Sequence, residues 1–254
     1  SEGNRANARA RAGDETVFEI PGFQERHVSQ WRLTDTGRTQ AQKVGEWLCS
    51  ERIVLDRGYV SFYIRAIETA VYLPNMPWIE TPYLREQVWG DLTSLADKER
   101  ISEYTRSLEV RKVQPFLWTP PGAGAESMDS YFTKTVDRML DVLNRSCGPM
   151  TVLLVTHGGW LWGLRQRMER LSQEELLRLR MSDHPHDHIQ KCHIFHYTRR
   201  NPWTKQIMSK IQWVRSICPW DQTLSSNEWR AIRRHTYSQD DLRRLVDAFP
   251  QLVT

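Results

Sequence analysis

The sequence has no long apolar run, few cysteines and no apolar leader at its N-terminus. Its best apolar stretch, Met150 to Val155, falls far short of the roughly 18–20 residues that a membrane span needs. The cysteines, Cys49, Cys147, Cys192 and Cys218, show no CxxC spacing, so neither a disulfide scaffold nor a cysteine zinc site is expected. These absences predict a cytoplasmic protein, in a reducing compartment and without membrane contact.

Charge of one sign is not concentrated anywhere either. Lysine and arginine total 35 against 31 acidic residues, a net charge of +4, and the arginines are spread along the chain. No basic run or nucleic-acid-binding motif occurs, so no nucleic-acid partner is expected. A basic pocket for a small anionic molecule fits the same balance. The 254 residues allow one large domain or two small ones, and the sequence leaves the oligomeric state open.

Strand-like and helix-like segments alternate along the chain. Thr151 to Val155 is continuously apolar, as a central parallel strand covered on both faces should be. Tyr59 to Tyr63 is rich in strand-forming residues and leads directly into a helical segment, Arg65 to Leu73. This alternation predicts an α/β fold, a three-layer α/β/α sandwich with a mostly parallel central sheet. Other expected elements are helices capped by Thr34, Ser172 and Ser238, a helix over Ser130–Asn144, and strands over Pro77–Glu80, Cys192–Tyr197 and Ile211–Ile217.

The segment VTHGG at 155–159 has the features of a ligand site. A buried strand would deliver His157 to its carboxyl end, where ligands sit in open parallel sheets. The glycines Gly158 and Gly159 let backbone approach a ligand, and the helix that follows presents N–H groups to an anion. A histidine that merely ends a strand is the plainer interpretation. The double glycine and the helix start favour contact of His157 and Gly158 with a phosphate.

Two further residues carry weaker signals. Arg65 stands at a second strand-to-helix junction, and its planar guanidinium suits bidentate contact with a phosphate. By itself, an arginine at a helix start is typical of a protein surface. Glu86 lies between apolar and aromatic residues just after a short strand, a setting that can raise a carboxyl pKa and suit proton donation. Taken alone, Glu86 is better explained as an exposed glutamate.

Together with two other segments, these residues resemble the histidine phosphatase (phosphoglycerate-mutase-like) superfamily. The matching segments are LTDTGRTQA at 33–41, SFYIRAIETA at 61–70, LREQVWGDL at 84–92, GAGAES at 122–127 and VTHGG at 155–159. They follow the family's order, and five in order are specific where one would not be. The resemblance runs from the start of the chain to the strand near 192–198. It implies one domain over 1–218 with a substrate-roofing insertion at 91–126, and the tail at 219–254 reads as a C-terminal helical extension.

The family's Arg-His-Gly signature, whose histidine is the phosphorylated nucleophile, does not occur in this sequence. The nearest match, Arg26-His27-Val28, lacks the glycine and has no apolar strand before it. In the family the signature often continues into x-Ser-Glu-x-Asn, and this chain opens with Ser-Glu-Gly-Asn at 1–4. The resemblance therefore implies that the first strand and the nucleophile lie upstream, so that the chain as written is inactive. His27 would lie near the pocket rim, and His27 as the nucleophile is the lesser alternative.

The activity that the resemblance implies is phosphomonoester hydrolysis through a phosphohistidine. Arg65 and His157 would bind the phosphoryl oxygens and offset their charge in the transition state. Glu86 would protonate the leaving oxygen and then activate water. The implied phosphate- or substrate-binding residues are Ser1, Asn4, Gly158, His27 and Trp118, and the insertion adds Tyr104, Arg106 and Arg111 by position alone. The partner would be a phosphorylated small molecule, and no metal or cofactor is implied.

Three alternatives stay open. A phosphoglycerate-mutase-type phosphotransferase would share the pocket and pass the phosphoryl group to a second substrate instead of water. A non-catalytic pseudophosphatase would use Arg65 and His157 to bind phosphorylated ligands without turnover. The His-rich run at 184–188, followed by His193 and His196, suggests a metal-dependent hydrolase, although its spacing matches no fixed zinc site.

Overall fold

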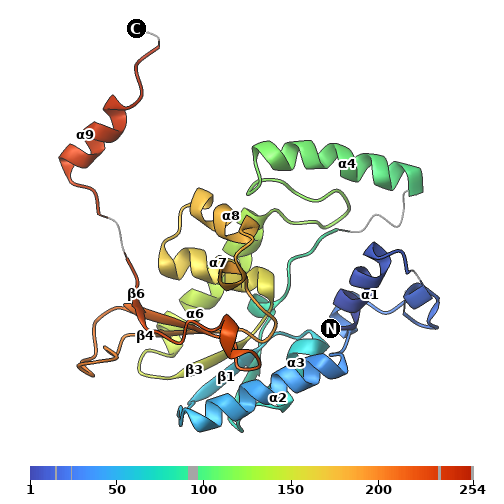
Figure 1. The fold of residues 1–254 in the computed structure, drawn as a ribbon, viewed down its shortest axis with the longest axis horizontal. Coiled ribbons are helices and arrows are strands. Elements are labelled where there is room, and N and C mark those ends of the chain that lie inside the picture. The colour runs from blue at the N-terminus through green and yellow to red at the C-terminus, as the bar shows by residue number, and fades with distance from the viewer. Residues whose placement is uncertain (15, 24, 91–96, 234–235, 253–254) are drawn as a thin grey trace.

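The computed structural model describes residues 1–14, 16–23, 25–90, 97–233 and 236–252 (Figure 1). The α-helices are α1 (Glu2–Arg11), α2 (Asp35–Ser50), α3 (Ile64–Val71), α4 (Asp97–Val113), α5 (Met128–Phe132), α6 (Arg138–Ser146), α7 (Gly158–Glu169), α8 (Gln173–Met181) and α9 (Gln239–Asp247). The strands are β1 (Arg57–Val60), β2 (Trp78–Glu80), β3 (Val152–Val155), β4 (Ile194–Thr198), β5 (Trp213–Ile217) and β6 (Arg230–Ala231). Over these described ranges, no helix has the length and apolar character of a membrane span.

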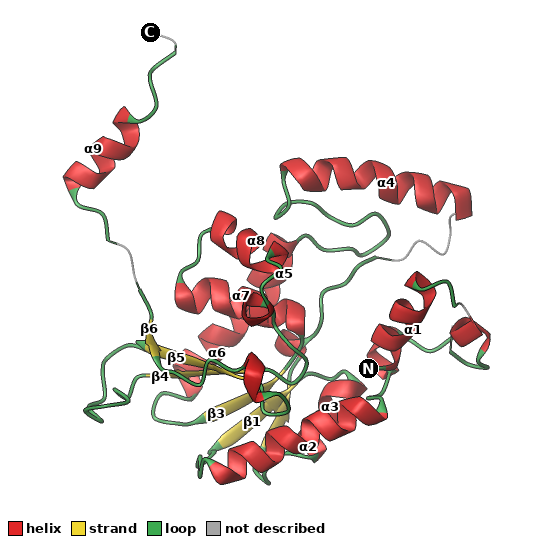
Figure 2. Cartoon of the chain, in the orientation of Figure 1, coloured by secondary structure: helices red, strands yellow, loops and turns green. Residues whose placement is uncertain are grey.

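Three parallel strands, in the order β2-β1-β3, form the sheet that positions the site. Tyr59 of β1 pairs with Ile79 on one side and with Leu154 on the other. Because α3 follows β1 and α7 follows β3, both helices begin at the carboxyl edge of this sheet. Figure 2 shows α2 and α3 on one side of the strands and α6 and α7 on the other. The expected α/β class is thus confirmed.

The strands β4, β5 and β6 form a separate antiparallel sheet. Phe195 of β4 pairs with Ser216 of β5, and Trp213 of β5 pairs with Ala231 of β6. Among the residues that the structure describes, no ladder joins this sheet to the parallel one. Each sheet therefore has two edge strands, β2 and β3 in the first and β4 and β6 in the second.

The main core lies against the parallel sheet under α5, α6 and α7. Trp160 of α7, Phe132 of α5 and Met139 of α6 are each at most 1% exposed. Gly163 of α7 allows the close approach, since a Cβ there would lie 2.6 Å from the Phe132 ring. The helix expected over Ser130–Asn144 is present but is interrupted by a π-helical turn over Thr133–Asp137.

Local sequence explains where several helices begin. Thr34 precedes α2 and accepts the amide of Gly37, as expected of an N-cap. Ser172 and Ser238 each form a capping box, with Glu175 at the start of α8 and with Asp241 at the start of α9. All three expected caps are confirmed.

Three expectations need correction. The strand expected over Tyr59–Tyr63 ends at Val60, because the chain leaves the ladder there and Tyr63 becomes the N-cap of α3. The strand expected from Ile211 begins at Trp213. The apolar strand β3 is covered less than a central strand should be, since only its last residue is fully buried. The reason is that one edge of β3 has no partner strand in the described part of the chain.

The expected insertion and tail are described only in part. Residues 91–96 lie outside the described residues, and α4 with the loop after it makes up the rest of 91–126. In the tail, the apolar face of α9 is present as expected. Leu242, Leu245 and Val246 of α9, and Phe249 just beyond its end, are all exposed, and α9 lies apart from both sheets (Figure 1). The domain division near 218 stays a prediction.

Candidate functional site

His157 lies beside Ser61 at the carboxyl edge of the parallel sheet. β1 and β3 end in register at Val60 and Val155, so the residues just beyond them meet. Nε2 of His157 is 2.9 Å from Oγ of Ser61. The ring of Tyr63 stands edge-on to the imidazole, with the ring centroids 4.8 Å apart. Two packed neighbours thus fix the orientation of the imidazole.

The imidazole of His157 is uncharged at neutral pH. Burial, and after it the charges of Arg65 and Lys191, hold the pKa of His157 well below its ordinary value. A neutral imidazole offers one N–H donor and one acceptor nitrogen. His157 is also the residue before α7, whose first amides, at Gly158 and Gly159, begin the helix. An anion at this position would meet free amides and the positive end of the helix dipole.

Arg65 lies in the first turn of α3, at the same edge of the sheet. Its guanidinium lies over the Tyr63 ring, 4.4 Å from the centroid, and one terminal nitrogen donates to the carbonyl of Val28 at 3.0 Å. Burial lowers the pKa of Arg65, and the nearby charge of Glu86 opposes that effect. In the described parts of the chain, no carboxylate forms an ion pair with Arg65. Its remaining N–H groups are suited to an anion.

Glu86 faces His157 from the loop after the short 3-10 helix Pro82–Leu84. Its Oε2 is 3.8 Å from Nδ1 of His157, and its Oε1 accepts the amide of Gln87 at 3.1 Å. Burial raises the pKa of Glu86, although the Gln87 amide and the charge of Arg65 act against that shift. Gly159 provides the space, since a Cβ there would lie 2.8 Å from Oε1 of Glu86. A carboxyl with a raised pKa can both give and take a proton.

The buried carboxylate of Glu126 holds the loop that carries Glu86. Arg85 binds it in a bidentate pair, at 2.7 and 2.6 Å, and the amide of Val88 donates to it at 3.2 Å. Burial acts to raise the pKa of Glu126, but the hydrogen bonds from Arg85 and Val88 outweigh it and the pKa is lowered. The hydroxyl of Tyr131 donates to the carbonyl of Arg85 at 2.7 Å. Glu86 is therefore presented by a fixed loop.

Three cations near this edge of the sheet, Arg65, Arg180 and Lys191, have no carboxylate partner in the described residues. Lys191 is close enough for its charge to act on both His157 and Glu86, and Arg180 acts on Glu86. The half-buried guanidinium of Arg180 donates to Sδ of Met128 at 2.8 Å. Cations without partners indicate that this edge attracts anions.

A groove of about 1250 Å³ runs along this edge and continues between β3 and β4. Of the eight residues expected in the site, six line it: Ser1, Asn4, Arg65, Glu86, His157 and Gly158. His27 and Trp118 do not. The exposed imidazole of His27 caps its own turn, with Nδ1 2.8 Å from Oγ of Ser29. Trp118 is buried under Arg111, 5.0 Å from its ring, and its indole N–H has no acceptor among the described residues.

Arg106, a further candidate of the insertion, does not line this groove. Arg106 is exposed and lies 3.6 Å from Glu103 on its own helix. The side chain of Tyr104 lies outside the described residues. The sequence analysis did not single out Ser61, Tyr63, Arg180 or Lys191 as site residues. Ser61 and Tyr63 lie inside the matching segment 61–70, which could have identified them. No local sequence pattern identifies Arg180 or Lys191.

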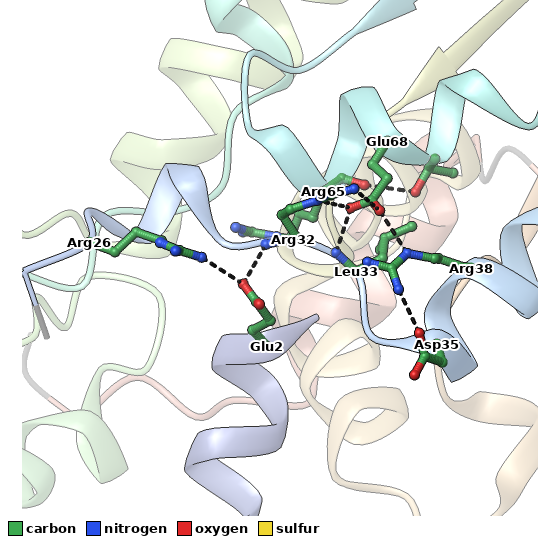
Figure 3. Close-up of polar contacts among 9 residues, drawn as sticks. Glu2, Arg26, Arg32, Leu33, Asp35, Arg38, Arg65 and Glu68 are labelled. Atoms are coloured by element: carbon green, nitrogen blue, oxygen red, sulfur yellow. Dashed lines mark hydrogen bonds and ion pairs between the residues drawn. The ribbon is translucent and has the colours of Figure 1, made fainter. Parts of the chain in front are cut away.

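Behind Arg65, the buried carboxylate of Glu68 ties α3 to the start of α2 (Figure 3). It accepts from Arg32 and Arg38, each at 2.9 Å, and from the amide of Leu33 at 2.8 Å. Burial acts to raise the pKa of Glu68, but these hydrogen bonds outweigh it and lower the pKa to about 2. Arg32 in turn donates its amide to Glu2 of α1 at 2.9 Å. The network therefore braces the N-terminal wall of the groove.

The His-rich run does not converge on a metal site. Within the described residues, no three His, Cys, Asp or Glu side chains are placed to hold one metal ion. His193 lies with Nε2 2.6 Å from Oγ of Ser216, and burial lowers its pKa to about 4. Burial likewise lowers the pKa of His196 to about 4. Both histidines are therefore neutral, His196 within β4 and His193 just before it.

Comparison with known families and structures gives one family. Its model, described as the histidine phosphatase superfamily (branch 1), matches residues 10–201. A 2,3-bisphosphoglycerate-dependent phosphoglycerate mutase of Parvibaculum lavamentivorans is 29% identical over 167 residues, which cover 60% of this chain and 76% of the relative. The enzyme of that name from Rhizobium meliloti is 27% identical over 169 residues, with the same coverage. A candidate alpha-ribazole-5'-P phosphatase of Escherichia coli shares the fold, with a TM-score of 0.52 at 17% identity over 81% of this chain and 85% of that one.

Proposed function

Because the chain belongs to the histidine phosphatase superfamily (branch 1), we propose that it hydrolyses phosphomonoesters through a phosphohistidine intermediate. The observation that carries the proposal is the meeting of three groups at one sheet edge. His157 is neutral and buried, Glu86 lies 3.8 Å from it with a raised pKa, and Arg65 has no carboxylate partner in the described residues. The nucleophile would be a histidine in a segment ahead of Ser1. The side chain of that histidine would reach the same groove.

In the first step the nucleophilic imidazole attacks phosphorus and the phosphorus–oxygen ester bond breaks. Arg65 donates to the non-bridging oxygens and offsets their charge. His157 donates its one N–H to the same phosphoryl group, assisted by the amides that begin α7. Glu86, protonated at the start, gives its proton to the leaving oxygen, so that the alcohol departs neutral.

In the second step Glu86 is the base. Its carboxylate takes a proton from water, whose oxygen attacks phosphorus while the phosphorus–nitrogen bond breaks. Inorganic phosphate leaves, the nucleophilic imidazole is restored, and Glu86 is again protonated. The raised pKa of Glu86 suits both roles, because it keeps the carboxyl protonated to a higher pH than usual.

The cations beyond the phosphoryl position favour a leaving group with a negative charge of its own. The charges of Arg180 and Lys191 lower the pKa of Glu86, and the charge of Arg111 lowers the pKa of Arg180. A phosphoglycerate-mutase-type transfer would use the same groups and differ only in the acceptor. The two activities can be told apart by their product: a phosphatase releases inorganic phosphate, whereas a mutase passes the phosphoryl group to a second phosphoglycerate.

The test is a chain extended ahead of Ser1 by an apolar strand that ends in Arg-His-Gly-Glu. We expect it to release phosphate from p-nitrophenyl phosphate and to carry an acid-labile phosphoryl group on the added histidine after rapid quench. The matched control carries glutamine in place of that histidine and should do neither. Equal release from both would remove the phosphohistidine mechanism. Tight orthovanadate binding with no release from either would replace the proposal by the non-catalytic, phosphate-binding alternative.

A further inference from the structure

The loop that joins β4 to β5, residues 199–212, carries positive charge only. Its charged residues are Arg199, Arg200, Lys205 and Lys210, and it contains no aspartate or glutamate. The first three donate to backbone carbonyls, and none of the four forms an ion pair with a carboxylate in the described residues. In a chain whose 35 basic and 31 acidic residues are otherwise mixed, this cationic loop is a local field that attracts anions.

The tip of the cationic loop is an ordered turn that leaves large apolar side chains in solvent. Oδ1 of Asn201 accepts the amides of Trp203 at 2.9 Å and of Thr204 at 3.0 Å. The amide of Asn201 donates to the carbonyl of Gln206 at 2.8 Å. Trp203 is nevertheless 67% exposed, and Ile207 is 58% exposed. Exposed apolar groups among cations, on a backbone that is already fixed, indicate a contact surface.

The helix α9 presents a second exposed apolar surface. Leu242, Leu245 and Val246, with Phe249 just past the helix end, recur at i, i+3, i+4 and i+7, the spacing of one helical face. All four are between 45% and 80% exposed. These four residues are called the α9 face below. A helix that is apolar on one side and charged on the others is suited to lie flat on a surface with its apolar side buried.

The charges of α9 nearly cancel. Arg243 pairs with Asp240 and Arg244 pairs with Asp241, all within this helix. Asp241 also closes the capping box with Ser238. Asp240 and Asp241 thus serve the start of the helix, where negative charge is favourable. The α9 face therefore offers apolar contact with little charge, and attraction to an anion has to come from the cationic loop.

The two features lie at the same end of the antiparallel sheet. The amide of Ile232, just past β6, donates at 2.8 Å to the carbonyl of Gln212, the last residue of the cationic loop. The chain thus leaves β6 beside the base of that loop, as Figure 1 shows. Ser238, the N-cap of α9, follows Ile232 by only six positions, so α9 begins within about 20 Å of it. Both features can therefore meet one surface.

This end of the molecule is opposite to the candidate site. A terminal nitrogen of Arg199 donates at 2.8 Å to the carbonyl of Gly148, which precedes β3. His157 follows the other end of β3. A surface that contacts the cationic loop therefore leaves the edge that carries His157 open to solvent, and the inference below does not rest on the proposed function.

We propose that the cationic loop and the α9 face together bind the surface of an anionic lipid membrane. The cations of the loop are attracted to the headgroups, within a Debye length of the surface. Trp203, Ile207 and the α9 face enter the boundary between headgroups and acyl chains, where tryptophan is favoured. Such peripheral contact needs no membrane-spanning helix, and it replaces the expectation of no membrane contact that the lack of long apolar runs suggested.

A lipid surface accounts for both features, whereas the other occupants account for one. A nucleic acid attracts cations but offers the α9 face nothing apolar to cover. A second copy of the chain covers the α9 face, but in a two-fold dimer it brings one cationic loop near another. A membrane surface is anionic, apolar a few ångströms below its headgroups, and broad enough for two elements that a short linker joins.

The test is flotation of the chain with lipid vesicles. We expect it to bind vesicles of phosphatidylcholine that contain about one third phosphatidylserine at about 0.1 M salt, and not to bind vesicles of phosphatidylcholine alone. Raising the salt to about 0.5 M should release the chain, because the attraction is screened. This measurement needs no variant.

Two sets of variants then locate the contact. Combined Arg200→Gln, Lys205→Gln and Lys210→Gln should lower the affinity for the anionic vesicles about a hundredfold, or about fivefold for each cation. The matched control, Arg106→Gln, Lys112→Gln and Arg178→Gln on exposed positions of α4 and α8, removes the same charge and should bind as the parent does. Equal losses from the two triple variants would assign binding to net charge and overturn the role of the loop.

The apolar contact is tested in the same way. Val246→Ser with Phe249→Ser should weaken vesicle binding at least about tenfold, the scale of two exposed side chains that lose apolar burial. Val110→Ser with Val113→Ser on α4, at positions that are also exposed, should leave binding unchanged. Equal binding by both serine pairs would remove the α9 face from the contact.

Three further outcomes would overturn the proposal. Absence of binding to the anionic vesicles, or equal binding to the neutral ones, would remove the anionic membrane as the partner. A dimer in solution that Val246→Ser with Phe249→Ser dissociates, in a chain that binds no vesicle, would assign the α9 face to a second copy. Binding of a DNA duplex through the three cations, again without vesicle binding, would assign the cationic loop to nucleic acid.

Discussion

Oε2 of Glu86 lies 3.8 Å from Nδ1 of His157, and burial shifts the pKa of each group toward its neutral form. A carboxylate beside an imidazole usually favours the charged pair. Here the loss of water outweighs that attraction, since His157 is 6% exposed and the side chain of Glu86, which lies against Gly159 of α7, is 27% exposed. The proposed function uses both shifts, because a protonated Glu86 could give its proton to a leaving oxygen beside a neutral His157.

Glu86→Gln should abolish leaving-group protonation in the chain extended by Arg-His-Gly-Glu. We expect hydrolysis of an alkyl phosphate to fall by about 10²–10⁴, the usual contribution of a positioned acid. The rate of the first step should fall less with p-nitrophenyl phosphate, because its leaving group is stable as an anion and needs no proton. The matched control is Glu80→Gln at the exposed end of β2, which should leave both rates unchanged. An equal loss of the first-step rate on both substrates would exclude Glu86 as the acid, whereas a shared loss in the second step is expected from its role as the base.

The same substitution should stabilise the fold at alkaline pH. The pKa of Glu86 is raised in the folded state, so the folded chain holds this proton more tightly than the unfolded chain does. The free energy of unfolding therefore declines as the pH rises from about 4.5 through the raised pKa of folded Glu86. Glutamine does not titrate, so the variant does not show this decline. We expect Glu86→Gln to melt above the parent at pH 8. Near pH 4 the two should melt together, and a uniform difference at every pH would contradict the titration of Glu86.

Glu68 predicts the opposite pH dependence. Its pKa is lowered from an ordinary 4.5 to about 2, so its contribution is complete above pH 4.5 and is lost as the pH falls toward 2. Because Arg32 is largely exposed, we expect Glu68→Gln to cost about 2 kcal/mol at pH 7, less than the full shift would give. Urea unfolding of both chains at pH 7 and pH 2.5 measures the difference. Asp141→Asn, which breaks only a surface pair with Arg145, is the control, and a cost from Glu68→Gln that persists at pH 2.5 would refute the assignment.

Much of this site was accessible from sequence because its groups follow strands. His157 and Arg65 each stand directly after a run of strand-forming residues, and parallel strands bring their carboxyl ends to one edge. The order of five short segments then gave the family and the fold. What the pattern could not give is burial. The sequence around Glu86 is that of an exposed glutamate, whereas in the fold its side chain is half-buried against Gly159, on a loop that Arg85 and Glu126 hold.

Two other features had no local signal. Arg180 belongs to a helix with charged residues on several faces, and only tertiary packing turns it toward Met128 and leaves it without a carboxylate in the described residues. The incomplete cover of β3 was also invisible, since a continuous apolar run predicts a central strand whether or not a neighbour is present. Trp118, expected in the substrate pocket, is instead buried beneath Arg111.

Arg180 should select substrates by the charge of the leaving group. In the chain extended by Arg-His-Gly-Glu, Arg180→Gln is expected to raise KM about tenfold for a phosphate ester whose leaving group carries a carboxylate, the scale of one charge-assisted hydrogen bond. It should change KM little for p-nitrophenyl phosphate, which has no second anion. Arg178→Gln, on an exposed position of the same helix, removes one positive charge without touching this edge and should leave both KM values unchanged. If the two variants raise KM alike, the effect belongs to the overall field of the protein and not to Arg180.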